Sequence, residues 1–160
     1  MPVDQRRNGQ IAEGVLLDAT NRLILAELQA DARISLAELG RRVGLSSPAV
    51  ADRVQRLERD GVITGYHAKV DARKVGFDLA FVIRIRPAPR QIPKVAELTR
   101  TLPEIVECHR ITGEDCFFMK AHVRSVEHLE EVIDQLNVYG QTTTSLIQSS
   151  PVPARGVQLA

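Results

Sequence analysis

A basic segment between two glycines, GLSSPAVADRVQRLERDG from Gly44 to Gly61, has residue types that bind DNA. Its apolar residues recur at helical spacing and form one stripe: Val50, Val54 and Leu57. The residues outside that stripe are polar, charged or small: Ser46, Ser47, Ala49, Asp52, Arg53, Arg56 and Arg59. Serine hydroxyls and helix amides bind phosphate, and arginine reaches phosphates and guanine edges. We predict that this outer set contacts double-stranded DNA.

Two further helices are expected to position the segment. The first begins at a cap supplied by Asp18 or Thr20, and its apolar residues have helical spacing: Leu17, Leu23, Ile24, Leu25 and Leu28. In the second, Ser35 and Glu38 have the spacing of a capping box, in which each side chain accepts from the other residue's amide. This second helix is expected to end at Gly44 and to bury three residues: Leu36, Leu39 and Val43.

The basic segment itself is expected to be a third helix, with Ser47 as its cap and Pro48 at its first position, ending at Gly61. Two short helices joined by a glycine turn predict a helix-turn-helix whose second helix enters a DNA groove. A solvated basic helix that binds nothing is the alternative. After Gly61, VITGYHAKVD predicts a short extended pair or wing around Thr64–Gly65.

The second half alternates strands and helices in the order βαββαβ, which is typical of the ferredoxin-like split βαβ fold. The expected elements are a strand at 79–86, a helix at 93–103, strands at 105–112 and 115–123, a helix at 125–140 and a strand at 141–149. We therefore expect an α+β protein with a polar tail at 1–16, a winged helix-turn-helix at 17–66, a linker at 67–78, a ferredoxin-like domain at 79–150 and a tail at 151–160.

Charge is distributed unevenly along the 160 residues, although the net charge is only +1. Residues 33–74 hold nine lysines and arginines against five acidic residues, whereas residues 75–160 hold nine against ten. A local basic excess favours two modules with different partners. No apolar run is long enough to span a membrane, and the polar start of the chain has no secretory leader. We expect a soluble, cytoplasmic protein without a cofactor.

A hairpin is predicted in ECHRITGEDCFFMKAHV, with Gly113 and Glu114 as a two-residue loop. In this register Thr112 faces Asp115, and Glu107 faces Lys120. One face is then mostly apolar and suited to cover by helices: Cys108, Arg110, Phe117, Met119, Ala121 and Val123. The other is mixed and suited to a partner sheet: Ile105, Glu107, His109, Ile111, Cys116, Phe118, Lys120 and His122. The cysteines and histidines lie either on opposite faces of this hairpin or far apart along a strand. The register therefore argues against a metal site and against a disulfide.

The chain resembles the Lrp/AsnC (leucine-responsive, feast/famine) family of transcription regulators over about residues 16–150. The resemblance is carried by the frame GLS…V..RV.RLE..GVI.GY and by the βαββαβ half, which is similar to that family's effector and oligomerisation (RAM-type) domain. It implies a DNA-binding regulator of amino-acid metabolism that forms homodimers, often assembles into octamers and often binds an amino-acid-like effector between dimers.

The resemblance also implies an effector site at the hairpin loop, from which this sequence departs. The family usually has Gly-x-x-Asp there, and its carboxylate holds the effector's amino group. Here the third residue after Gly113 is Cys116, so either Asp115 takes that role through a shifted loop or the role is absent. Opposite this loop the family uses a threonine, for which Thr144 is the best match among Thr142, Thr143 and Thr144. The implied effector residues are Thr112, Gly113, Glu114, Asp115, Cys116 and Thr144.

Two functions from different classes remain. The first is the DNA-binding regulator. The second is a metabolite-sensing ferredoxin-like module that regulates a partner protein and not DNA. An enzyme is not expected, since the sequence has no Ser/His/Asp order, no Cys–His pair within one site, no phosphate-binding glycine loop and no plausible carboxylate pair.

Overall fold

The computed structural model describes residues 17–159, so the tail expected at 1–16 lies outside the described residues. The described chain forms two compact units. The first holds the residues up to Ala68 together with the segment from Ala154 onward, and the second runs from Lys69 to Pro153. The expected irregular tail at 151–160 has no helix or strand in its described part, yet Leu159 packs against the core of the first unit. None of the described helices is both long and apolar enough to cross a membrane.

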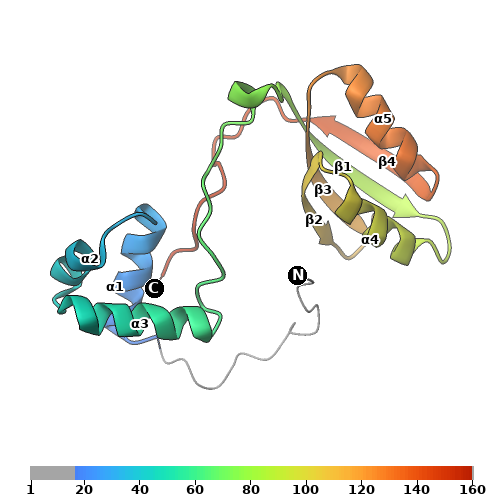
Figure 1. The fold of residues 1–160 in the computed structure, drawn as a ribbon. Coiled ribbons are helices and arrows are strands. Elements are labelled where there is room, and N and C mark those ends of the chain that lie inside the picture. The colour runs from blue at the N-terminus through green and yellow to red at the C-terminus, as the bar shows by residue number, and fades with distance from the viewer. Residues whose placement is uncertain (1–16, 160) are drawn as a thin grey trace. The chain divides into compact units, whose positions relative to one another are not determined.

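The first unit contains three helices, α1 (Ala19–Ala30), α2 (Leu36–Val43) and α3 (Ser47–Arg59), drawn in blue to green in Figure 1. Asp18 is the N-cap of α1, which confirms one of the two caps expected from the sequence, Asp18 or Thr20. Gly44 ends α2 in the left-handed conformation, at φ 71°, which glycine adopts without strain. The start of α3 was predicted one residue too late, because Ser46 is its N-cap and Pro48 lies in its first turn.

One small apolar core holds the three helices together. Its buried side chains include the predicted stripe of α3 and residues from the other two helices: Ile24, Leu25, Leu39, Val50, Val54 and Leu57. Leu39 was correctly predicted to be buried, and Val43 packs half-buried at the margin of this core. The prediction for Leu36 is wrong, since 45% of its surface is exposed. Leu36 is the first residue of α2, and the buried surface of that helix consists of Leu39 and Gly40.

The turn between α2 and α3 is tight because Gly40 has no side chain. The Leu45 amide donates to the Gly40 carbonyl at 2.8 Å. A Cβ placed on Gly40 would lie 2.6 Å from the Leu45 carbonyl oxygen, closer than van der Waals contact permits. This close backbone approach fixes where α3 leaves the turn.

The segment after α3 differs from the expected strand pair. Val62 and Ile63 pack against the helical core. Residues 64–71 form no strand ladder within the described chain, so the short extended pair around Thr64–Gly65 is not present there. The connector then forms one turn of 3-10 helix, Arg73–Val75.

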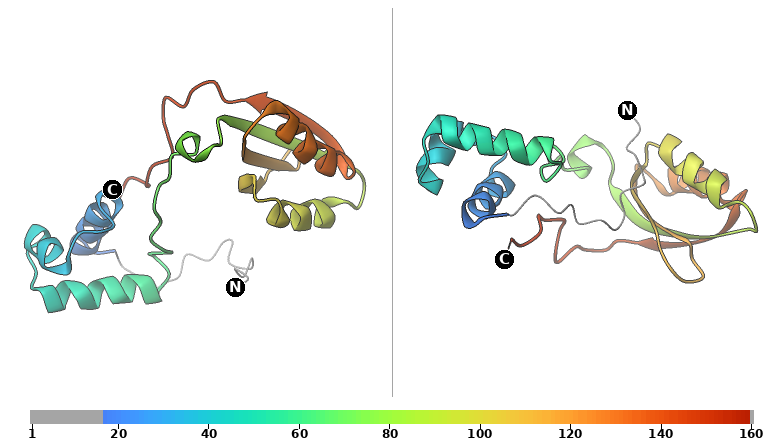
Figure 2. Two further views of the ribbon diagram at one scale, coloured as in Figure 1. Left: turned by 45° about the horizontal axis from the view of Figure 1, so that its top comes forward. Right: turned by 90° about the horizontal axis from the view of Figure 1, so that it is seen from below.

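The second unit confirms the βαββαβ order and the ferredoxin-like fold. Its elements are β1 (Leu79–Pro87), α4 (Ile92–Thr101), β2 (Ile105–Arg110), β3 (Phe117–Val123), α5 (Val126–Asn137) and β4 (Gly140–Leu146). The strands form one antiparallel sheet in the order β2-β3-β1-β4. Both helices lie on one side of this sheet (Figure 2).

The two faces of the sheet have different characters. Every second residue of β3 is buried, and Val95 of α4 and Leu129 of α5 lie in the same core as these residues. The opposite face is not covered by the helices, and we call it the open face. Its side chains are Val82, Arg84, Arg86, Glu107, His109, Phe118, Lys120, His122, Gln141, Thr143 and Ser145.

The predicted hairpin register is confirmed, because Glu107 pairs with Lys120 and the Ile111 amide donates to the Cys116 carbonyl at 3.0 Å. The expected placement of Ile105 and Cys116 on the open face is wrong, since both pack against the helix-side core. For Ile105 the reason is a bulge, which shifts the pairing between Ile105 and Glu107 and so reverses the alternation.

Replacing Gly40 with alanine should destabilise the first unit, because the added methyl group would collide with a backbone carbonyl. Overpacking of this kind costs about 1–3 kcal/mol. Intrinsic helix propensity would favour alanine by about 1 kcal/mol, so a lower melting temperature in thermal unfolding of the full chain identifies the collision as the cause. Gln55→Ala, at an exposed helical position, is the control and should melt like the parent. An unchanged melting temperature for Gly40→Ala would show that the turn accommodates the added methyl group without strain.

Candidate nucleic-acid interface and effector loop

The outer side of α3 is exposed as the sequence predicts, with one exception. Six of the predicted contact residues are exposed in the first unit: Ser46, Ser47, Ala49, Asp52, Arg56 and Arg59. Arg53 is half-buried, with 33% of its side chain exposed, compared with 62% for Arg56. The periodicity of α3 therefore presents serine hydroxyls at one end and arginines further along the same helix.

The N-terminus of α3 lacks the side-chain cap that the neighbouring helices have. The Asp18 carboxylate accepts from the Asn21 amide at 2.6 Å in α1, and the Ser35 hydroxyl accepts from the Glu38 amide at 3.2 Å in α2. Among residues 17–159, no side chain makes the corresponding bond in α3, although Ser46 occupies the cap position. Amides in the first turn of a helix have no partner within the helix, and together with the helix dipole they attract anions.

The two exposed arginines of α3 have acidic neighbours on the surface. Arg56 donates to Asp52 one helical turn earlier, with 2.7 Å between Nη2 and Oδ2. Arg59 lies 3.4 Å from Asp60. Exposed pairs of this kind contribute little to stability. Both guanidinium groups can therefore exchange a carboxylate for a phosphate at low cost.

Arg53 is tied into the first unit by contacts that sequence reasoning missed. Its Nη1 atom donates to Asp18 at 2.7 Å and to Asn21 at 2.9 Å, and so joins α3 to the start of α1. The hydrogen bond from Arg53 is the main reason that the pKa of Asp18 is lowered. Asp18 thus caps α1 and binds α3 with the same carboxylate. No local pattern indicates this contact, because Asp18 and Arg53 are 35 residues apart.

Arginines of α2 are likewise engaged. The Glu38 carboxylate accepts from Arg41 and Arg42, and these two hydrogen bonds lower the pKa of Glu38 to about 2. Arg42 also reaches Glu27 of α1 at 2.7 Å. Half of the predicted capping box is thus observed: Ser35 caps the Glu38 amide, but the Glu38 side chain binds arginines and not the cap amide.

Tyr66 ties the segment that follows α3 back to that helix. Its hydroxyl donates to the Glu58 carboxylate at 2.8 Å. Burial, followed by the bond to Glu58, raises the pKa of Tyr66 to about 12. The residues directly after the basic helix are therefore attached to it without a strand ladder.

In the second unit, the loop between β2 and β3 carries five of the six predicted effector residues; the sixth, Thr144, lies on β4. Thr112, Gly113 and Glu114 are exposed, while Asp115 and Cys116 are half-buried. Gly113 has φ 109°, a conformation that other residues rarely adopt, so the glycine is needed for the turn. The Cys116 amide donates to the Ile85 carbonyl at 3.0 Å, which fixes the end of the loop to β1.

Two arginines of β1 hold the acids of this loop, and the sequence prediction did not include them. Arg84 and Arg86 both lie on the open face because one residue separates them. Arg84 Nη1 lies 3.4 Å from Asp115 Oδ2, and Arg86 donates to Glu114. The sequence signal that could have indicated them is the alternation of arginine and isoleucine at Arg84-Ile85-Arg86 near the end of β1.

The threonines of β4 divide between the two faces. Thr144 pairs with the buried Ile83 and therefore lies on the helix-side face. Thr143 pairs with Arg84, so it lies on the open face in the same row as the arginine that reaches Asp115. Thr142 donates to Asn137 of α5 at 2.8 Å. The structure thus brings Thr143, and not Thr144, onto the face that carries the charged groups of the loop.

The cysteines and histidines of the second unit do not converge. Cys108 and Cys116 are both free thiols, and burial raises the pKa of Cys108. His109 lies within 2.6 Å of Glu107, and His128 lies within 2.9 Å of Glu104. Among residues 17–159, no three His, Cys, Asp or Glu side chains are placed to hold a metal ion.

Comparisons with known proteins match both units. Residues 17–64 match the family described as winged helix-turn-helix DNA-binding, and residues 80–157 match the Lrp/AsnC ligand binding domain. The HTH-type transcriptional regulator LrpC of Bacillus subtilis is 35% identical over 133 residues, which cover 83% of this chain and 92% of LrpC. A leucine-responsive regulatory protein of Serratia marcescens is 35% identical over 131 residues, 80% of either chain.

Solved structures of similar proteins match over most of the chain. A feast or famine regulatory protein from M. tuberculosis, complexed with L-methionine, has a TM-score of 0.84 and 31% identity, covering 89% of this chain and 99% of that chain. The structure of B. subtilis LrpC has a TM-score of 0.81 and covers 84% of this chain.

Proposed function

This chain belongs to the Lrp/AsnC family of transcription regulators, and we propose that α3 is the helix through which it reads DNA. The observation that carries the proposal is the exposed side of α3, which combines an N-terminus without a side-chain cap with two exposed arginines. The second function, docking on a partner protein without contacting DNA, is not favoured, since the relatives are named as transcriptional regulators. We propose a regulator and not an enzyme.

Phosphate recognition begins, in this proposal, at the start of α3. The exposed hydroxyls of Ser46 and Ser47 stand beside first-turn amides that no side chain caps. A DNA phosphate satisfies both kinds of donor at once. Ala49 is small and exposed, so it lets the helix backbone approach the groove.

Base and backbone contacts further along α3 are assigned to Arg56 and Arg59. Arginine binds guanine in a bidentate manner, and it also binds phosphate. Asp52 orients the Arg56 guanidinium before DNA arrives, because the two residues are one helical turn apart and ion-paired. Arg53 has a different role in this proposal: its bonds to Asp18 and Asn21 set the angle of α3 on α1.

The protein is also proposed to act as a homodimer that assembles further, up to an octamer, through the sheets of the second unit. The open face supports such contact, because it mixes apolar Val82 and Phe118 with charges of both signs, such as Lys120 and Glu107. A copy of the same face presents the complementary charges. Pairing two copies also supplies two α3 helices for the two half-sites of a DNA operator.

The loop at 112–116 is proposed to bind an amino-acid-like effector through a shifted version of the family's arrangement. The carboxylate of Asp115 lies beside the Arg84 guanidinium, and Thr143 adds a hydroxyl in the same row. An α-amino acid carries one ammonium and one carboxylate. It can therefore pair its ammonium with Asp115 and its carboxylate with Arg84. Each of these two side chains then keeps a partner of opposite charge after the Asp115–Arg84 ion pair separates.

The variants Arg56→Ala and Arg53→Ala should differ in their effects on DNA affinity and on melting temperature. Arg56→Ala should weaken binding of the intact protein to DNA from its own upstream region by roughly tenfold, as expected for loss of one base or phosphate contact, and leave the melting temperature unchanged. Arg53→Ala should lower the melting temperature as well as DNA affinity, because it removes the bonds to Asp18 and Asn21.

The matched control for these variants is Arg100→Ala, which removes an exposed helical arginine from the second unit and should bind DNA like the parent. Fluorescence anisotropy and thermal unfolding measure the two quantities. If Arg56→Ala binds DNA as tightly as the parent, Arg56 is not part of the interface. If Arg53→Ala melts like the parent, its bonds to α1 do not stabilise the unit.

Asp115→Ala should abolish the thermal shift caused by whichever of the twenty amino acids stabilises the parent protein. A ligand that binds only the folded state raises the melting temperature, so loss of binding removes the rise. Asp134→Ala, which removes an exposed carboxylate from α5, should retain the shift. Retention of the full shift in Asp115→Ala would place the effector elsewhere in the protein.

A further inference from the structure

The last described residues of the chain return to the first unit. The segment PVPARGVQLA, from Pro151 to Ala160, was expected to be an irregular tail. Its described part has no helix or strand, yet the residues from Ala154 onward belong to the compact unit that contains α1, α2 and α3. A terminal segment without secondary structure is poorly ordered unless a contact ties it down. A specific contact is therefore needed to hold this one.

Leu159 makes that contact. Its side chain is half-buried and packs against the apolar core that holds the three helices together. Gly156 passes close to Gln29 near the end of α1, since a Cβ placed on Gly156 would collide with the Gln29 side chain. Val157 lies between these two contacts, and 76% of its surface is exposed. The segment thus touches the helical unit through Gly156 and Leu159, while Val157 stays in solvent.

The attachment depends on packing and not on a backbone ladder. No backbone hydrogen bond joins residues 154–159 to the rest of the described chain. Among the described residues, the core that Leu159 contacts has six buried side chains, all from α1, α2 and α3. A core of this size buries little apolar surface, so the contribution of one more leucine is a considerable share of the total.

Two prolines stiffen the stretch that leads to Leu159. Proline holds φ near about −65° and favours an extended chain. Pro151 and Pro153 therefore make residues 147–153, which we call the spacer, semi-rigid. A stiff spacer loses little conformational entropy when its end is anchored, and it passes a displacement of one end to the other.

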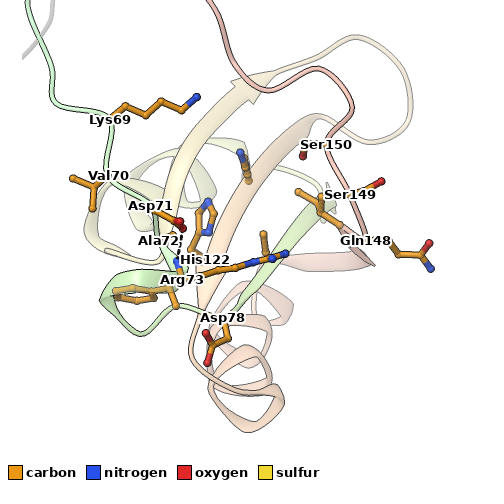
Figure 3. Close-up of a pocket in the computed structure, with 14 residues that line it drawn as sticks. Lys69, Val70, Asp71, Ala72, Arg73, Asp78, His122, Gln148, Ser149 and Ser150 are labelled. Atoms are coloured by element: carbon orange, nitrogen blue, oxygen red, sulfur yellow. Dashed lines mark hydrogen bonds between the residues drawn. The ribbon is translucent and has the colours of Figure 1, made fainter.

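The spacer and the connector leave the second unit at the same place. The spacer begins at Ile147, whose amide donates to the Ala80 carbonyl of β1 at 2.8 Å. Figure 3 shows the next spacer residues, 148–150, and the connector residues 69–73 around one hollow in the surface. The chain passes between the two units twice, once through the connector and once through the spacer.

We propose, on the basis that α3 reads DNA, that residues 154–159 are a strap through which the second unit controls the position of α3. The strap follows β4, the strand that carries Thr143 of the proposed effector site, so it joins that site to the helical core without passing through the connector. Its anchor, Leu159, belongs to the first unit and does not involve the open face.

The strap has a direct consequence for DNA binding by a dimer. A unit attached at two points has less freedom than a unit attached at one. Once the first α3 is bound, this restriction raises the effective concentration at which the second α3 meets its half-site. Releasing the strap should therefore weaken DNA binding although every DNA-contacting side chain is still present.

Thermal unfolding of the full chain tests the anchor. Leu159→Ser should lower the melting temperature by at least about 4 °C, because it removes apolar packing from a small core. Val157→Ser is the matched control, since it removes an exposed apolar side chain from the same segment and should melt like the parent. Equal melting temperatures for these two variants would show that Leu159 is not an anchor and would overturn the proposal.

A flexible insert tests the strap separately from the anchor. A glycine-serine segment placed between Pro153 and Ala154 keeps Leu159 but loosens the spacer, so the melting temperature should equal that of the parent. The matched control carries the same segment after Ala160 and has the same mass. Compared with this control, the inner insert should give a larger radius of gyration in small-angle X-ray scattering without DNA. Its affinity for DNA from the protein's own upstream region should be lower by about threefold or more.

The two measurements distinguish failure of the strap from failure of the DNA assignment. If both insert variants have the same radius of gyration and the same DNA affinity, residues 154–159 do not act as a strap. If the inner insert raises the radius of gyration while the parent itself binds no DNA, the strap is supported and the assignment of α3 is contradicted.

Discussion

Three buried side chains on one side of α3, Val50, Val54 and Leu57, determine which side of that helix remains for DNA. A helix repeats every 3.6 residues, so burying this stripe places Arg56 and Arg59 outside the core. The Gly40–Leu45 contact fixes the point at which α3 begins. Stability and recognition are thus two consequences of one packing arrangement.

Charge in the first unit is divided in a similar way. Arg42 is bound by an acid of α1 and Arg53 by the acid that caps α1, so both arginines connect the helices. Within the described part of the chain, Arg56 and Arg59 are paired only with acids on α3 or directly after it. An arginine held by a distant helix is costly to redirect, whereas an exposed local pair is easily exchanged for phosphate. The distinction between the two kinds of arginine comes from their partners and not from their spacing.

Local patterns predicted the three helices of the first unit, the βαββαβ order of the second, the core stripe of α3 and the Glu107–Lys120 register correctly, because each depends on residues close in the chain or on a turn between them. They wrongly predicted an extended pair around Thr64–Gly65. Contacts between distant segments were missed. Arg53 meets Asp18, and Arg84 meets Asp115, through tertiary packing that no short pattern encodes. The bulge before Glu107 places Ile105 on the other face, which strict alternation along the strand does not predict.

The most direct test of the central claim is the salt dependence of DNA binding by the intact protein. If α3 binds DNA through phosphates, the logarithm of the association constant should fall linearly with the logarithm of salt concentration. The slope should be about −0.9 for each phosphate contacted, because bound counterions are released. Binding that stays constant between low and physiological salt, or no binding to its own upstream DNA at low salt, would contradict the assignment of α3 as the DNA-reading helix.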